Sequence, residues 1–225
     1  MVTLSCRSTS TREINETLHQ LPPGSEVVIT DPMGTHNLAV GLMQPIIITI
    51  DGNAGYYIGG LCDGPSITVK GSVGWGVAEN LMSGTVRVEG NASEAAAASA
   101  HGGRVFVNGD ASSRAGISLK GGTLVVGGDV GHMSGFMAQA GTLLVGGDAG
   151  EALGDSLYEA VIYVGGKVRS LGADTRVEDL NDADVLGVKE LVAASGFDGI
   201  DPQNVTKVAS AKTLYNFDAL KNQSY

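Results

Sequence analysis

The chain has 225 residues, enough for one large domain or two small ones. Its 14 basic and 24 acidic side chains give a formal net charge of −10, which argues against binding nucleic acid or an anionic membrane through bulk charge. Glycine occurs 34 times and aromatic residues make up only 5% of the chain. That composition is typical of a turn-rich β protein rather than of a helical or Rossmann enzyme.

The N-terminal sequence MVTLSCRSTS lacks the pattern of a secretory signal, and no run of about 18 apolar residues occurs. Cys6 and Cys62 are too few for a disulfide framework or a four-cysteine metal site. We therefore expect a cytoplasmic protein without a membrane span.

The first segment predicts a cap over residues 1–45. Ser10 and Glu13 have the spacing of a capping box, so a helix is expected over residues 11–21, before two prolines and a glycine. Residues 26–30 favour a strand. The residues after that strand lead into the first clear repeat.

A 19-residue period dominates the middle of the chain. The repeats superimpose without insertion and begin at Ile47, Ser66, Thr85, Arg104, Thr123, Thr142 and Val161. The second and fourth residues of each repeat are aliphatic, as in a strand with one buried face. Since one repeat cannot bury that face alone, neighbouring repeats must stack. The pattern predicts an all-β fold with short flanking helices, in which a parallel β-helix of about seven 19-residue coils occupies residues 46–176.

The sixth residue of every repeat is glycine: Gly52, Gly71, Gly90, Gly109, Gly128, Gly147 and Gly166. Such a column indicates turns where φ is positive or where backbones approach closely. We interpret these residues as structural turn glycines rather than phosphate loops. The aspartates Asp110, Asp129 and Asp148 that follow in three repeats are interpreted as turn formers that bond to backbone, not as calcium ligands.

Residues 177–225 are expected to form a helix and a packing tail. A helix is predicted over residues 181–195 with Gly196 as its cap. The tail is expected to pack on something, because it contains the apolar or aromatic residues Val205, Val208, Leu214, Tyr215, Phe217 and Leu220.

Outward-facing apolar residues mark candidate interfaces. The third residue of the last four repeats is Phe106, Val125, Leu144 or Tyr163, and stacking would join them into an apolar ladder. Such a ladder must be covered, either by the chain's own C-terminal segment or by a partner subunit. Tyr56, Tyr57 and Trp75 on the turns of the first two repeats form a second candidate surface. His36 is a further candidate, with either a structural hydrogen bond or a contact to a partner or substrate as its role.

No catalytic, cofactor-binding or metal-binding residues are expected in this chain. The four histidines do not pair with each other or with a cysteine at ligand spacing. Cys62 falls in the same column as Leu81, Leu119 and Leu157, which predicts a buried core residue rather than a nucleophile.

The repeat columns resemble the GXGXG domain of the glutamate synthase family, a right-handed parallel β-helix. The resemblance covers about residues 28–176 and includes Gly34–Gly41, Gly52–Gly55, Arg114 and Gly147–Gly150. One stretch departs from the family pattern: residues 132–137 read HMSGFM and lack the Cys and Glu of the large glutamate synthases. Whatever those two residues do in the family is not carried over.

A separate chain of this size resembles most the β-helix subunit of N-methylglutamate synthase, which divides glutamate synthase among three chains. The resemblance implies a hetero-oligomer with a class II glutamine amidotransferase-like subunit and an FMN-binding glutamate synthase-like subunit. FMN and an iron–sulfur cluster are then expected in the partner, and no cofactor in this chain. The reaction would convert methylamine and L-glutamate into N-methyl-L-glutamate and ammonia.

Three alternatives remain open. The chain could be a stand-alone β-helix subunit of a glutamate synthase, or a subunit of formylmethanofuran dehydrogenase, which shares the repeat. A β-helix acyltransferase is disfavoured, because those enzymes use hexapeptide units and 18-residue coils, whereas this chain has a 19-residue repeat.

Overall fold

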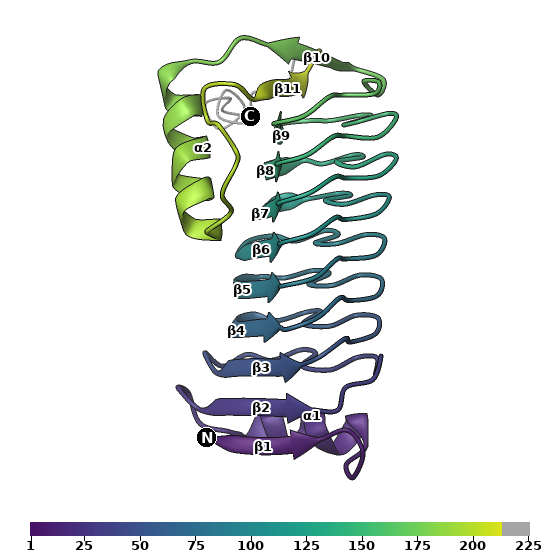
Figure 1. Ribbon diagram of the computed structural model, residues 1–225, viewed down its shortest axis with the longest axis vertical. Coiled ribbons are helices and arrows are strands. Elements are labelled where there is room, and N and C mark those ends of the chain that lie inside the picture. The colour runs from purple at the N-terminus through teal and green to yellow at the C-terminus, as the bar shows by residue number, and fades with distance from the viewer. Residues whose placement is uncertain (213–225) are drawn as a thin grey trace, which may run out of the picture.

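The computed structural model describes residues 1–212 and shows a tall stack of coils with a helix at its lower end and another along one side (Figure 1). The tail residues Leu214, Tyr215, Phe217 and Leu220, which we expected to pack, lie outside the described residues.

One sheet runs the length of the stack. Across residues 1–212 it has eleven strands in the order β1-β2-β3-β4-β5-β6-β7-β8-β9-β11-β10. The bounds are β1 Val2–Ser5, β2 Glu26–Thr30, β3 Ile47–Asp51, β4 Asp63–Val69, β5 Ser83–Val88, β6 Arg104–Val107, β7 Lys120–Val126, β8 Ala140–Val145, β9 Val161–Val164, β10 Thr175–Glu178 and β11 Thr206–Ser210. From β3 to β9 each strand pairs in parallel with the next, one repeat further along the chain. The predicted parallel β-helix of about seven coils is confirmed.

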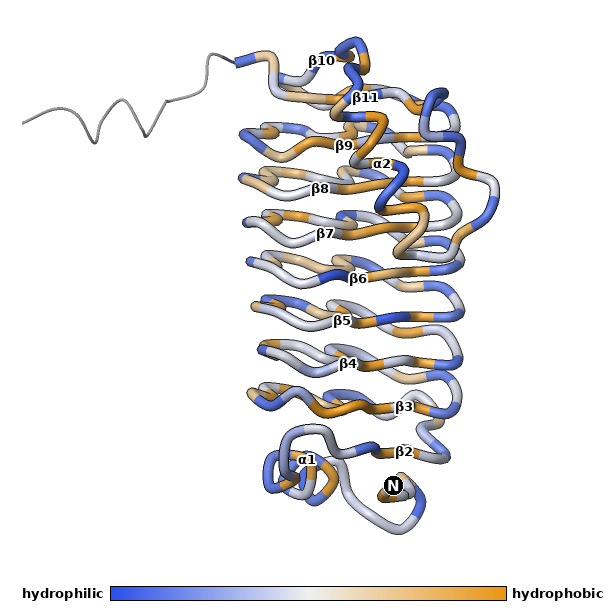
Figure 2. Tube along the Cα trace, turned by 90° about the vertical axis from the view of Figure 1, so that its left-hand side faces the viewer, coloured by the Kyte–Doolittle hydropathy of each residue, from blue (hydrophilic) through white to orange (hydrophobic). Residues whose placement is uncertain are grey.

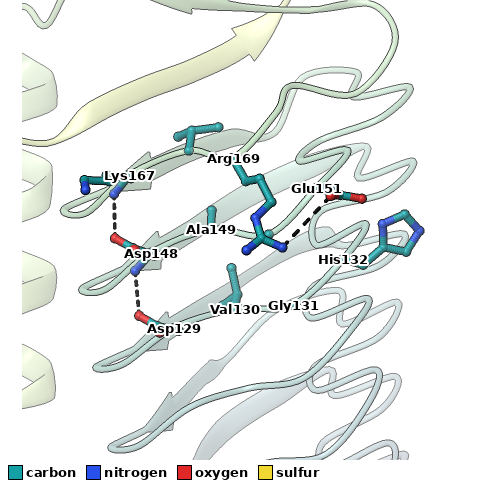
Figure 3. Close-up of a pocket in the computed structure, with 11 residues that line it drawn as sticks. Asp129, Val130, Gly131, His132, Asp148, Ala149, Glu151, Lys167 and Arg169 are labelled. Atoms are coloured by element: carbon teal, nitrogen blue, oxygen red, sulfur yellow. Dashed lines mark hydrogen bonds and ion pairs between the residues drawn. The ribbon is translucent and has the colours of Figure 1, made fainter.

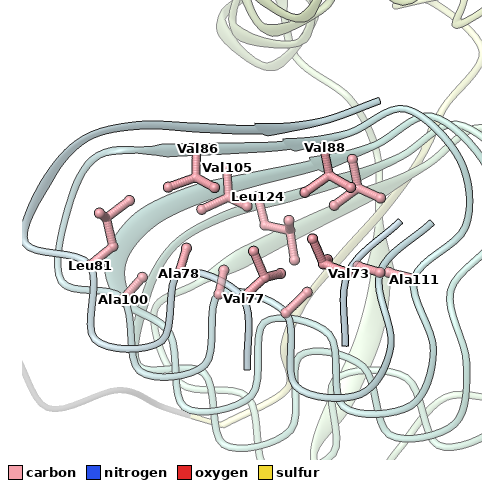
Figure 4. Packing of buried hydrophobic residues seen from close by; sticks show 14 of the residues in the cluster. Val73, Val77, Ala78, Leu81, Val86, Val88, Ala100, Val105, Ala111 and Leu124 are labelled. Atoms are coloured by element: carbon pink, nitrogen blue, oxygen red, sulfur yellow. The ribbon is translucent and has the colours of Figure 1, made fainter. Parts of the chain in front are cut away.

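The core fills the inside of the coils, as the repeat predicts. The second and fourth residues of each repeat point inward; Val86 and Val88, for example, are completely buried. Small residues face them from the opposite wall, where Val73 and Ala92 begin a row of parallel bridges that continues to Val168. Figure 4 shows strand valines and Leu124 packed against alanines and valines of that wall.

The thirteenth position of the repeat is small for a reason that the structure shows. Gly59 has a φ of +67° and Ala78 a φ of +57°, so the chain takes a left-handed turn there in successive coils. A Cβ at Gly59 would lie 3.1 Å from a methyl of Ile67. A larger side chain would combine an unfavourable φ with overpacking of the core.

The sixth-position glycines are required by close approach rather than by φ. Only Gly52, at +135°, has a left-handed φ. At Gly109, Gly128, Gly147 and Gly166, a Cβ would clash with a side-chain oxygen of the coil before. From Gly90 onward each of these glycines also donates its N–H to the glycine one coil earlier, at 2.9–3.1 Å.

The oxygens that fill this space form a second ladder, which we call the Asx ladder because most of its members are Asn or Asp. Each member except the last accepts a hydrogen bond of 2.7–3.1 Å from the backbone N–H of the residue one repeat later. The column comprises Asn53, Ser72, Asn91, Asp110, Asp129, Asp148 and Lys167, the last acting only as a donor. The three aspartates therefore bond to backbone, as predicted, but they join successive coils rather than closing their own turns.

Both ends of the stack are covered. Helix α1 (Thr11–Gln20) has the predicted capping box at Ser10 and buries Ile14 and Leu18 at the lower end. At the upper end β11 pairs antiparallel with β9 and β10. The division at residues 45 and 176 stays a prediction, and the sheet continues across both boundaries.

Helix α2 (Asp182–Ser195) lies alongside β6–β9 (Figures 1 and 2). Gly196 ends it with a φ of +71°, as the sequence predicts, and Asn181 caps its first turn.

Candidate docking surfaces

Three aromatic rings stack on the outside of the early coils. The centroids of His36 and Tyr56 are 4.3 Å apart and the rings are 15° from parallel. Those of Tyr56 and Trp75 are 5.5 Å apart, at 23°. Tyr56 is 49% exposed and Trp75 55%. We call these three residues the aromatic stack.

The backbone beneath the His36 and Tyr56 rings explains why these two rings lie close against the coils. A Cβ at Gly74 would clash with the Tyr56 ring, and a Cβ at Gly55 would clash with the His36 ring. The backbone N–H of Tyr56 donates to Nδ1 of His36 at 2.9 Å. His36 therefore makes the structural hydrogen bond that was one of its two predicted roles, while its ring remains exposed.

Tyr57 takes a different position from the other aromatic residues of this region. It has a φ of +64° and is half-buried, with its ring against the backbone of Gly60 and near Gly76. A carboxylate oxygen of Glu79 reaches the same place, 2.9 Å from where a Gly76 Cβ would lie. Tyr57 therefore lies between the aromatic stack and Glu79, and its ring is not part of the stack.

Two glutamates border the aromatic stack. Burial raises the pKa of the Glu79 carboxyl above its usual value. Glu94 follows Trp75 by one repeat and is half-buried. None of the ion pairs found among residues 1–212 involves either carboxylate.

The apolar ladder on the later strands is covered by the chain itself. Phe106, Val125, Leu144 and Tyr163 are between 0% and 8% exposed. They form a second hydrophobic cluster with residues of α2 and of the segment that follows it: Val188, Phe197, Ile200 and Val205. Figure 2 shows the hydrophobic stretches of β7–β9 beneath α2. Of the two covers that the sequence leaves open for these four residues, the structure has the chain's own C-terminal segment, which removes them from solvent.

Arg87 fixes the lower end of this cover. It occupies the same third position on β5, and its guanidinium donates to the carbonyl oxygens of Ser195, at 2.8 Å, and Ala194, at 3.3 Å. These carbonyls end α2, where a cation is favourable. The guanidinium also lies 4.6 Å from the ring centroid of Phe106 and 5.9 Å from that of Phe197.

A polar cluster fixes the upper end. The Tyr163 hydroxyl donates to Asp184 at 2.7 Å, and Lys207 Nζ lies 3.0 Å from Asp184 and 3.5 Å from Glu178. Burial alone would raise the pKa of Asp184, but hydrogen bonds from Asn181, Tyr163 and Lys207 hold it below its usual value. The same partnership with Asp184 raises the pKa of Lys207.

A shallow groove of about 640 Å³ lies on the later coils, between two rows of charged side chains (Figure 3). One row belongs to the Asx ladder and the other contains His132, Glu151 and Arg169. Arg169 and Glu151 are 4.0 Å apart and largely exposed. The mixed charges select no single class of ligand.

The cysteines do not have the surroundings of a nucleophile. Cys62 is fully buried and donates to the carbonyl oxygen of Ala39 at 3.1 Å, and burial raises its pKa to about 11. Burial also raises the pKa of Cys6. Cys62 is therefore a core residue, as its column predicts.

Among residues 1–212, no three His, Cys, Asp or Glu side chains gather closely enough to hold a metal ion. Within the same residues, neither helix has the length and apolar character needed to cross a membrane.

Comparison with known proteins gives one partial similarity. No protein-family model matches the chain. Over 67 residues it is 43% identical to Protein GlxC of Rhizobium meliloti (strain 1021), a match that covers 28% of this chain and 29% of that protein. The match thus spans less than a third of the relative's own length.

Sequence reasoning missed two features of these surfaces. The first is the role of Arg87, the third residue of its repeat, in holding the end of α2. The second is the acidic border formed by Glu79 and Glu94. The signal for the second was available, because Glu94 follows Trp75 by one repeat and Tyr56 by two, in one column.

Proposed function

We propose that this chain is a non-catalytic assembly subunit of a glutamate synthase-type complex, and that the complex is an N-methylglutamate synthase. The observation that carries the proposal is the parallel pairing of β3–β9, in which the second and fourth residues of each repeat pair with the residues 19 positions later, together with the glycine column that this stacking requires. This is the pattern on which the resemblance to the GXGXG domain rests. The partial similarity to Protein GlxC adds support for a glutamate synthase-related role.

The physical role follows from the rigidity of the solenoid. Six steps of about 4.8 Å separate β3 from β9, so the two lie about 29 Å apart. Backbone ladders, the Asx ladder and the buried core link every step. Such a body can hold an amidotransferase-like chain and an FMN-binding chain in a fixed relation, so that an amine released at one active site reaches the other.

Reconstitution tests this proposal. The chain is produced with the amidotransferase-like and FMN-binding chains of its own host, and the mixture is supplied with ¹³C-methylamine and L-glutamate. Formation of labelled N-methyl-L-glutamate, with release of ammonia, is followed by mass spectrometry. We expect product only when all three chains are present, a yellow complex, and no flavin on this chain alone.

The control replaces this chain with an unrelated β-helix protein of similar size. Turnover of the two other chains at the full rate without this chain would refute the assembly role. Turnover with ammonia but not methylamine would favour an ordinary glutamate synthase. A complex that carries tungsten or molybdenum with a pterin would refute the proposal and identify a formylmethanofuran dehydrogenase instead.

A further inference from the structure

The aromatic stack is ordered before any partner arrives. The rings of His36 and Tyr56 lie against glycine backbone, His36 accepts a hydrogen bond from the main chain of Tyr56, and the Trp75 ring stacks on that of Tyr56. About half of the surface of Tyr56 and Trp75 is nevertheless exposed. Rigid, exposed Trp and Tyr side chains lose little conformational entropy on binding, and they are typical anchors of protein interfaces.

Acidic side chains outnumber basic ones in the coils that carry the aromatic stack. Between residues 32 and 101 the acidic side chains are Asp51, Asp63, Glu79, Glu89 and Glu94, whereas the basic ones are Lys70 and Arg87. The Arg87 guanidinium is already engaged with the end of α2. Glu79 is partly buried beside Tyr57 and forms no ion pair among the described residues. A partly desolvated carboxylate without a counter-ion gains from a cation that a partner supplies.

We propose that the aromatic stack, together with Tyr57, Glu79 and Glu94, is the docking surface for a partner chain that presents an arginine or lysine side chain. The inference rests on the proposed function, because the partner is taken to be a chain of the same complex. A guanidinium or ammonium placed against Trp75 gains a cation–π contact. Glu94 lies one coil away, about 4.8 Å along the stack, so the same cation reaches its carboxylate.

A second copy of this chain fits the surface less well. In a two-fold symmetric contact the same patch meets itself, so the carboxylates of Glu79 and Glu94 would face their own equivalents. With a net charge of −10 on each copy, like charges would oppose the contact. Charge complementarity therefore selects a basic partner surface.

The experiment measures binding of the purified chain to the amidotransferase-like chain and to the FMN-binding chain, each produced separately, by titration calorimetry at low and at high salt. Two variants alter the surface: Trp75→Ala, and the double variant Glu79→Gln with Glu94→Gln. Two matched controls lie on α2: Leu186→Ala, where the leucine is 57% exposed, and Glu190→Gln. Circular dichroism melts establish that every variant is folded.

We expect Trp75→Ala to weaken binding of one of the two chains at least about tenfold and to leave the other unchanged. The double variant, which keeps the shape of both side chains, should weaken the same contact severalfold and reduce its salt dependence. If Trp75→Ala is not folded, the double variant alone decides. Both controls should bind within about twofold of the unaltered chain.

The outcomes separate the two proposals. If the unaltered chain binds its partners and both surface variants bind equally well, the docking surface is refuted while the assembly role stands. If the unaltered chain binds neither partner, the assembly role fails, and the docking surface fails with it. If the chain dimerises alone in light scattering and Trp75→Ala makes it monomeric, the surface belongs to a second copy and the proposal of a basic partner is wrong.

Discussion

Two groups of outward-facing apolar side chains lie on the same solenoid and differ in their exposure to solvent. The ladder from Phe106 to Tyr163 is buried beneath α2 and the segment after it. The aromatic stack at Tyr56 and Trp75 stays half exposed, with acidic side chains around it. In both groups the period of the repeat puts the residues in columns. What differs is whether a non-repeating part of the chain lies over the column.

This difference teaches that a repeat specifies where a side chain points but not what covers it. The cover depends on α2, which the period does not contain, and on single contacts such as Arg87 with the end of α2. An outward apolar column is therefore an interface candidate only after the flanking segments have been placed.

The largest expected effect comes from the inside of the coils. Val126 points into the core and its neighbour Val125 points under α2, and both are 0% exposed. Val126→Asp buries an unpaired charge between coils and should remove roughly 5 kcal/mol or more, which is enough to unfold a typical domain. Urea unfolding followed by circular dichroism measures this effect.

Val125→Asp is the matched comparison. Its charge can escape to water when α2 detaches, so the coils should remain folded while α2 loses protection against hydrogen exchange. Equal loss of structure in both variants would show that the cover and the coils fold as one unit.

A matched pair of aromatic truncations tests the comparison directly. Phe106→Ala removes a ring packed edge-on against Phe197 and under Arg87, and should destabilise the protein by about 3 kcal/mol. Trp75→Ala removes a larger but half-exposed ring and should cost less than about 1 kcal/mol. The free energies of unfolding of both variants are compared in urea. A cost for Trp75→Ala as large as that for Phe106→Ala would mean that the stack is a structural element rather than a surface kept for a partner.

Much of the fold could be predicted from the sequence because the repeat is free of insertions. Alternating aliphatics at the second and fourth positions fix the inward face, while the capping box at Ser10 and the glycine at Gly196 locate the two helices. The column of sixth-position glycines predicts structural turns but not whether positive φ or close approach requires glycine there. That choice depends on the preceding coil, whose side-chain oxygen would collide with a Cβ.

The surfaces were less predictable. Tyr56 and Trp75 could be placed in one column, but the position of the Tyr56 ring depends on Gly74 and on the ring of His36, which lies one position outside that column. The cover over Phe106 and Val125 was one of two open alternatives. Nothing local in the sequence indicated that Asp184 on α2 would meet Tyr163 and Lys207, since these contacts join residues 21 and 23 positions apart.

The cluster at the upper end of the cover predicts a dependence on pH. The folded-state pKa of Asp184 is lowered, so its stabilising contribution is present above the unfolded value of about 3.9 and is lost as the pH falls through the folded value. Lys207 has a raised pKa, so its contribution is present below about 10.4 and is lost as the pH rises through its folded value. Docking of α2 should therefore be strongest between these limits.

Asp184→Asn should cost roughly 1–3 kcal/mol at pH 7, because the pair with Lys207 is only 10–12% exposed. The variant should also lose less stability than the unaltered chain when the pH is lowered to 3. Hydrogen exchange of α2 measures both effects, and Glu190→Gln is the control on the exposed side of the helix. An unchanged loss of stability at pH 3 in Asp184→Asn would show that this cluster does not hold α2 on the coils.

The smallest effect tests what the two regions have in common. The Asx ladder runs past the aromatic stack at Asn91 and past the covered strands at Asp129, with the same bond to the next coil, of 2.9 Å and 2.7 Å. Asn91→Ala and Asp129→Ala should therefore each cost about 1 kcal/mol, the value of one backbone N–H left without its acceptor. Asp129→Asn keeps the acceptor and relieves repulsion from Asp110 and Asp148, so it should be neutral or slightly stabilising. Thermal melts of the three variants make the measurement. If Asp129→Ala loses markedly more stability than Asn91→Ala, the segment over the later coils, and not the Asx ladder alone, holds those coils together. If both variants lose the same stability, the two regions differ only in whether α2 and the segment after it cover the outer column.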